Sequence, residues 1–201
     1  MLYAKILGKE MKYRLPLAVT SAALFAVLFS INGFAVGKTE PAYVLFALAA
    51  CSVILHNDEE ELLMIGQMQL ARIFLIRFAA SVISVSALPI AMILLFTKER
   101  RPLKMAIAFF VLVLVISAIG AFFRVLLKST AVSMIFSLLL YIALMLASER
   151  EIFPLFYSVR IADMQSFYWN RLIWFGVSVA LLGVSVLVLR ARDSYGLFKR
   201  K

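Results

Sequence analysis

The chain has 201 residues, of which 64% are hydrophobic and 16% are charged, and its formal net charge is +10 at pH 7. Its mean hydropathy of +1.00 exceeds what the core of a soluble protein requires and is typical of a polytopic membrane protein. The composition therefore excludes a soluble globular fold. The positive charge does not require a nucleic acid, because basic residues beside membrane helices bind anionic lipid.

Six apolar stretches resemble membrane spans, since a helix of about 20 apolar residues crosses the hydrocarbon core. They are continuously apolar, whereas the strands of a membrane barrel alternate in polarity. The sequence predicts an all-α membrane protein with one transmembrane domain, residues 1–201, and six transmembrane helices. The predicted spans are residues 15–37, 41–56, 78–96, 105–123, 131–147 and 172–189.

Small residues mark places where these helices can approach closely. Gly33 and Gly37 are four residues apart at the end of the first predicted span, and Gly176 and Gly183 lie in the last. Such spacing predicts helix packing. The stretch GFAVGKT is not a phosphate loop, because it has one residue too few between its glycines and ends a membrane helix.

Little in the chain predicts catalysis. The single Cys51 lies in the second span and cannot form an intrachain disulfide, and the lone His56 has scarcely any partners for a metal site. The six spans hold no acid away from their ends, which disfavours a proton-coupled transporter. We expect no enzyme activity, no metal site and no cofactor in this chain.

Four consecutive acids, from Asp58 to Glu61, separate the second span from the third. The simplest interpretation is a helix start, with Asn57 as the cap and acids that complement the helix dipole. Apolar residues then alternate with Gln67, Gln69 and Arg72 at helical spacing. This pattern predicts a helix over residues 57–77 that lies along the membrane surface and is exposed for docking.

The distribution of Lys and Arg predicts that both termini are cytoplasmic. With that orientation, 13 of the 21 basic residues lie inside and eight outside. The loop TKERRPLK, with Lys98, Arg100, Arg101 and Lys104, disagrees, because it would lie outside. A missed or re-entrant segment is the alternative topology.

Residues 148–171 precede the last span and contain apolar positions at helical spacing, which suggests two short helices. Aromatic rings favour the membrane interface. We therefore expect an interfacial role, or plain anchoring, for Phe153, Phe156, Tyr157, Phe167, Tyr168 and Trp169.

Three motifs in succession resemble the type 2 ABC exporter permeases. The acids are followed by Glu61-Leu62-Leu63-Met64, where the family carries Glu-Leu-Leu-Leu, but Gln67 and Gln69 replace the usual Pro and Ser, and Arg77 replaces Lys. The stretch ISAIGAFFRVLLKSTAVSMIFSLLL is similar to the family's fourth span, short basic turn and fifth span. The beginning AKILGKEMKYR is similar to its amphipathic connecting helix, here residues 1–14.

The resemblance implies a permease subunit of an ATP-driven exporter in the cell membrane. Residues 57–77 would be the coupling helix, and short outer-leaflet helices would precede the last span. The partners would be an ABC ATPase subunit that holds ATP and Mg, and a second permease copy or sister subunit. The residues expected to couple to the ATPase are Glu60, Glu61, Gln67, Gln69, Arg72, Arg124 and Lys128.

The substrate would be hydrophobic or amphipathic, a lipid or a peptide, because apolar spans without buried charge suit these better than small ions. The alternative is an immunity-type membrane protein that binds a hydrophobic peptide or lipid without an ATPase.

Overall fold

The computed structural model describes residues 2–54, 70–98, 100–127, 129–149, 155–156 and 165–198. These residues form six α-helices and no strand, which confirms the prediction of an all-α chain. The helices are α1 (Leu2–Ile31), α2 (Val36–Ile54), α4 (Leu70–Phe96), α5 (Pro102–Leu127), α6 (Thr130–Glu149) and α8 (Phe167–Phe198).

Five helices, α1, α4, α5, α6 and α8, contain segments that are long and apolar enough to cross a membrane. The chain thus has the character of a multi-pass helical membrane protein, as its composition predicted. Helix α2 is the exception, because Lys38 and Glu40 lie in its first turns and make this helix less apolar. The second of the six expected spans therefore stays a prediction.

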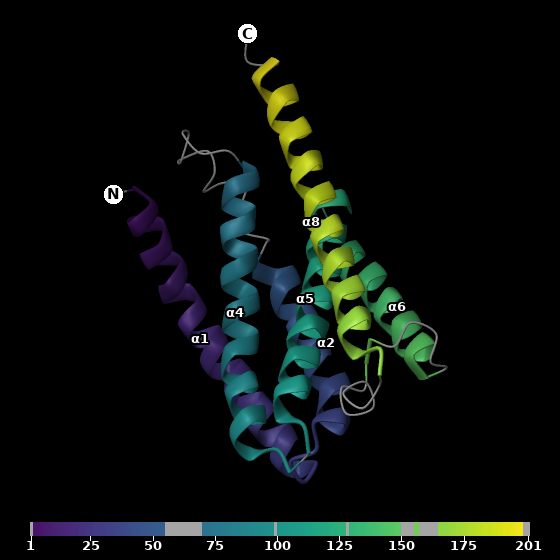
Figure 1. The fold of residues 1–201 in the computed structure, drawn as a ribbon. Coiled ribbons are helices and arrows are strands. Elements are labelled where there is room, and N and C mark those ends of the chain that lie inside the picture. Colours follow the sequence, from purple (N-terminus) through teal and green to yellow (C-terminus); the bar gives the residue numbers. More distant parts are fainter. Residues whose placement is uncertain are drawn as a thin grey trace.

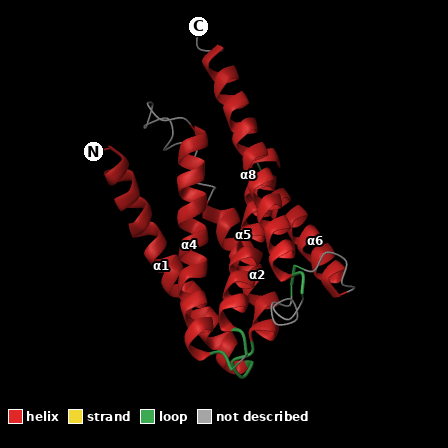
Figure 2. Ribbon diagram, viewed as in Figure 1, coloured by secondary structure: helices red, strands yellow, loops and turns green. Residues whose placement is uncertain are grey.

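Consecutive helices run in opposite directions along the bundle (Figure 1). The two chain termini lie at one end, which we call the terminal end. The turn between α1 and α2 and the turn between α4 and α5 lie at the opposite end, which we call the turn end (Figure 2). This alternation agrees with the expected order of the helices, in which both termini share one side.

Helix α5 occupies the centre of the bundle and packs against α2, α4, α6 and α8. It is the most deeply buried of the five apolar helices, with 78% of its span inside the protein. Its residues are small or apolar on every side, from Ala106 to Ala121. A helix that is hydrophobic all round is expected in such a central position.

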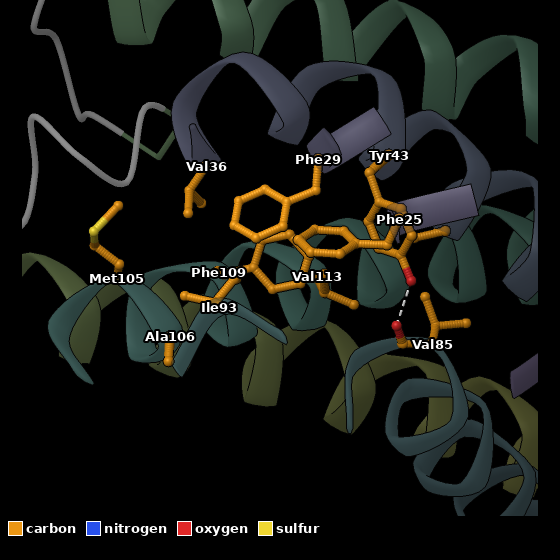
Figure 3. Packing of buried hydrophobic residues seen from close by; sticks show 11 residues of the cluster. Phe25, Phe29, Val36, Tyr43, Val85, Ile93, Met105, Ala106, Phe109 and Val113 are labelled. Carbon is orange, nitrogen blue, oxygen red and sulfur yellow. Dashed lines mark hydrogen bonds between the residues drawn. The ribbon is translucent and has the colours of Figure 1, made fainter. Parts of the chain in front are cut away.

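An aromatic cluster joins α1, α2 and α5 toward the turn end. The ring of Phe25 contacts the rings of Phe29, Tyr43 and Phe109, with centroids 5.1–5.4 Å apart. Aromatic pairs in such tilted or edge-to-face arrangements add stability beyond the area they bury. The hydroxyl of Tyr43 also donates a hydrogen bond to the carbonyl oxygen of Val85, which connects α2 to α4 (Figure 3).

The boundary between the first two helices differs from the expected one. Helix α1 ends at Ile31 instead of residue 37, and α2 begins at Val36 instead of residue 41. Gly33 and Phe34 lie between them with positive φ angles of 65° and 64°. Glycine adopts this conformation without steric cost, so Gly33 allows the tight turn that ends α1.

The other helices extend past the apolar stretches from which they were predicted. Helix α1 runs unbroken through residues 2–31, so residue 14 is not a helix boundary, and an interfacial segment over residues 1–14 stays a prediction. Helix α4 begins at Leu70, within the expected coupling segment. Helix α8 already begins at Phe167, so the end of the 148–171 segment belongs to the last helix.

Candidate functional site

Two buried residues of opposite charge, one in α2 and one in α8, interact electrostatically. Glu40 is the fifth residue of α2 and Arg171 is the fifth residue of α8, and both helices begin at the turn end. Glu40 is completely buried and Arg171 is 3% exposed. The carboxylate and the guanidinium interact electrostatically. Because burying a charge is costly, the two groups are expected to depend on each other.

Arg171 also binds two backbone carbonyl groups of other segments. Its Nη1 donates hydrogen bonds to the carbonyl oxygens of Ala108 in α5 and Leu155, at 3.4 Å and 3.3 Å. The Oγ of Ser148 in α6 accepts hydrogen bonds from the backbone N–H groups of Leu155 and Phe156, at 2.9 Å and 3.2 Å. Arg171 thus fixes α8 against α5 and against the segment that follows α6.

Helix α6 contacts α2 at the same level. The hydroxyl of Tyr141 donates a 2.8 Å hydrogen bond to the carbonyl oxygen of Pro41, the residue after Glu40. The Tyr141 ring packs edge-on against Phe156, with centroids 5.2 Å apart. Four helices and the 155–156 segment therefore meet around Glu40 and Arg171.

Further polar atoms lie beside Arg171 on α8. Asn170 and Trp174 are four residues apart and so occupy one face of the helix. The Oδ1 of Asn170 and the Nε1 of Trp174 are buried and form no hydrogen bond with the described residues. Two buried polar atoms near Arg171 therefore have no hydrogen-bond partner among the described residues.

The predicted spans alone do not indicate this site. Glu40 falls in the connection between the predicted spans 15–37 and 41–56 and so lies outside both. In the structure Glu40 lies in the second turn of α2 and is buried, so a buried acid stands just outside the predicted span 41–56. An ionisable residue in such a position marks a candidate functional site. The sequence does contain a signal for this site. Glu40 and Arg171 have opposite charges, and each stands next to the start of an apolar stretch.

A second polar contact joins α1 to α4. The Nη1 of Arg14 donates a hydrogen bond to the Oγ of Ser81, which in turn donates a 2.8 Å hydrogen bond to the carbonyl oxygen of Arg77. Further along the interface between α1 and α4, the Oγ of Ser21 donates a 3.3 Å hydrogen bond to the carbonyl oxygen of Ser84. Arg14 and Arg77 are both buried. These contacts attach α4, the helix that follows the acidic segment, to α1.

Of the residues expected to contact an ATPase, two are described with their side chains. Arg72 is exposed near the start of α4, and Arg124 is half-buried near the end of α5. Both lie toward the terminal end of the bundle (Figure 1). The other five lie outside the described residues: Glu60, Glu61, Gln67, Gln69 and Lys128.

Gly33 and Gly37 do not form the packing surface that was expected. Gly33 lies in the turn and Gly37 in α2, so they do not share one helix face, and that interpretation is wrong. A Cβ atom at Gly176 or Gly183 would meet no atom of the described residues within 4 Å, so there is open space beside both glycines in the described part of the chain. Both remain available for a contact with another subunit.

The aromatic residues before the last span separate into two groups. Phe156 and Phe167 are completely buried, which corrects their expected place at an exposed interface. Tyr168 and Trp169 are 67% and 70% exposed at the start of α8. Phe153 and Tyr157 lie outside the described residues.

Within the described part of the chain, no three His, Cys, Asp or Glu residues gather as a metal site would require. Comparison of the chain with family models, curated proteins and solved structures gives no match.

Proposed function

We propose that the chain is the permease subunit of an ATP-driven ABC exporter, with two permease subunits and two ATPase chains in the working complex. The proposal rests on the succession of sequence motifs that resemble the type 2 permeases. The observation that supports it best is the way α2 and α4, the helices on either side of the acidic segment, are attached to the rest of the bundle.

Helices α2 and α4 form a connected unit. The hydrogen bond from Tyr43 to Val85 joins them, and both contribute to the aromatic core around Phe25. Near the turn end, Glu40 of α2 interacts electrostatically with Arg171 of α8. A displacement of the acidic segment by an ATPase would therefore reach α8 through α2, provided that α2 moves as a rigid helix.

In the proposed mechanism, this connection transmits a movement of the coupling segment to the bundle. Closure of the ATPase pair on ATP would move the coupling segment, and the contacts of α2 would favour one of two arrangements of the bundle. Coupling of this kind requires that ATP binding and substrate binding each differ in free energy between the two arrangements. In this chain the residues that would carry the change are Tyr43, Glu40 and Arg171.

The proposed substrate is a hydrophobic or amphipathic lipid or peptide. The helices expose many apolar side chains along their length, among them Leu139 of α6 and Leu187 of α8. The buried polar atoms around Arg171 add a place where a polar group could be accommodated. In this proposal six helices cross the cell membrane, α2 included, and both termini are cytoplasmic.

Site-directed crosslinking tests the partner. In a Cys51→Ser background, a cysteine introduced by Glu61→Cys should crosslink to a separate ATPase chain in native membranes. The chain isolated in mild detergent should contain that ATPase in fixed proportion. Arg100→Cys, at the turn end, is the matched control and should give no such crosslink.

Repeated isolation without an ATPase, together with no crosslink from Glu61→Cys, would contradict the proposal. That result would favour a membrane protein that binds a hydrophobic peptide or lipid by itself.

A further inference from the structure

Four basic residues gather at the turn end of the bundle. Lys98, Arg100 and Arg101 occupy the turn between α4 and α5, and Lys104 lies in the first turn of α5. We call these four residues the basic rim. Lys98, Arg100 and Arg101 are exposed, and the stretch TKERRPLK that contains the rim has a single acid.

Aromatic rings from neighbouring segments hold two of these cations in place. The Nζ of Lys98 lies 5.8 Å from the centre of the Phe34 ring, in the turn between α1 and α2. The Nζ of Lys104 lies 5.1 Å and 5.4 Å from the centres of the Phe167 and Tyr168 rings of α8. Cation–π contacts of this kind restrict the side chains. The basic rim is therefore attached to the starts of α2 and α8.

The basic rim lies directly beside exposed apolar side chains. Leu95 and Phe96, at the end of α4, are 74% and 58% exposed, and Leu103, at the start of α5, is 65% exposed. Tyr168 and Trp169 are exposed at the start of α8, and such rings favour the level of lipid headgroups. The change from apolar to basic side chains places the rim at the boundary between hydrocarbon and headgroups.

The buried acid at the start of α2 does not offset the charge of the rim. Glu40 interacts with Arg171, so it does not neutralise the exposed cations. The first turn of each of α2, α5 and α8 contains no acid, and these helices start toward the turn end, so their dipoles add to the positive potential. An anion at the level of the headgroups would be strongly favoured.

We propose that the basic rim is a binding surface for anionic phospholipid. The lipid phosphates accept hydrogen bonds from Lys98, Arg100, Arg101 and Lys104, while the acyl chains cover Leu95, Phe96 and Leu103. An acidic soluble protein fits less well, because it would leave this apolar border uncovered. The proposal holds for either orientation of the chain in the membrane and does not depend on an ATPase partner.

Fluorescence quenching by brominated lipids tests this surface. The chain has two tryptophans, of which Trp169 is exposed beside Tyr168 and Trp174 is 9% exposed. The full chain is reconstituted in vesicles in which brominated phosphatidylglycerol or brominated phosphatidylcholine replaces part of the lipid. We expect phosphatidylglycerol to be preferred at least about fivefold, the factor that one basic residue near an anionic surface supplies. In Trp169→Phe this difference should disappear.

Two variants separate the charge of the rim from its structure. Replacing all four basic residues by Gln should bring the lipid preference close to one. Replacing Lys98, Arg100 and Arg101 alone leaves the contacts of Lys104 intact and should lower the preference at least about twofold, on the same basis. The matched control removes four cations beyond the last span, Arg190, Arg192, Arg200 and Lys201, again by Gln, and should keep the preference.

Three results would overturn the proposal. The first is equal quenching by the two lipids in the unchanged chain. The second is an unchanged preference in the variant that lacks Lys98, Arg100 and Arg101. The third is loss of the preference in inorganic phosphate but not in sodium chloride of equal ionic strength, which would assign the rim to a soluble phosphate compound.

Discussion

Glu40 in α2 and Arg171 in α8 interact with each other although both are almost completely removed from solvent. Each stands one turn inside the start of its helix, and the two helices come from opposite halves of the chain. The pair is an electrostatic link between the helix before the acidic segment and the last helix. Its energetics therefore bear on any movement of these two helices relative to each other.

Removing one member of this pair should destabilise the protein more than removing both. Glu40→Gln leaves the Arg171 guanidinium buried without its counter-charge, and Arg171→Met does the same to the carboxylate. Each should cost roughly 3–5 kcal/mol of unfolding free energy. The double variant should cost clearly less than the sum. Denaturant unfolding in detergent micelles measures the unfolding free energy of the unchanged chain, the two single variants and the double variant. If the costs of the two single variants add up in the double variant, the charges do not stabilise each other.

The aromatic core should depend on Phe25. Its ring is completely buried and contacts three other rings, so Phe25→Ala should lower the free energy of unfolding by about 3–5 kcal/mol through loss of packing and an unfilled cavity. Phe96→Ala is the matched control, since the Phe96 ring is 58% exposed at the end of α4. The same micelle assay compares them. Equal costs would mean that the core around Phe25 is not the main stabilising cluster.

The orientation of the helices can be tested by labelling. In a Cys51→Ser background, cysteines introduced by Glu60→Cys and Glu99→Cys should react with a membrane-impermeant reagent from opposite sides of the membrane. The expectation follows from six spans with cytoplasmic termini, because the two positions fall in connections on opposite sides. Labelling of both positions from the cytoplasm would contradict the six-span topology and favour a re-entrant segment.

The acidic segment should matter for coupling rather than for folding. Charge reversal by Glu61→Lys should leave the chain folded and inserted, while export and substrate-stimulated ATP hydrolysis fall together, because the contact that links the two equilibria is lost. Reconstituted vesicles measure both activities. Arg72→Glu, on the exposed start of α4, should act in the same way.

A residue that only caps a helix would behave differently. It would cost about 1 kcal/mol of helix stability without separating ATP hydrolysis from export. If both reversals leave the two activities unchanged, the acidic run is only a helix start.

The working complex should contain two permease chains, because six spans are half of the usual complement of such exporters. Gly176 and Gly183 are exposed on α8, have open space beside them among the described residues and permit a close helix contact. The mass of the complex in nanodiscs should show two copies, or one copy with a sister subunit. A single permease chain in an active complex would refute this, and Gly176→Leu should weaken the association if α8 forms the interface.

The sequence by itself determined the class of the protein and the approximate positions of five apolar helices. Continuous apolar stretches near the length of a membrane span have no other stable form, because each backbone N–H and C=O group must be paired within the segment. The central residues of α4, α5, α6 and α8 were therefore predictable. The helix ends were not, since helices continue past the apolar stretch wherever the flanking residues allow it.

Only the tertiary structure decided where the charges lie. Lys38-Thr39-Glu40 resembles a solvated connection, yet only Lys38 is exposed, and Glu40 is buried and interacts with Arg171, which the packing of α8 on α5 holds in place. Gly33 likewise looked like part of a helix-packing motif and instead supplies the positive φ of a turn. Composition and periodicity report which residues favour apolar surroundings. Which charged side chain meets which other one depends on contacts between distant segments, and no local pattern encodes them.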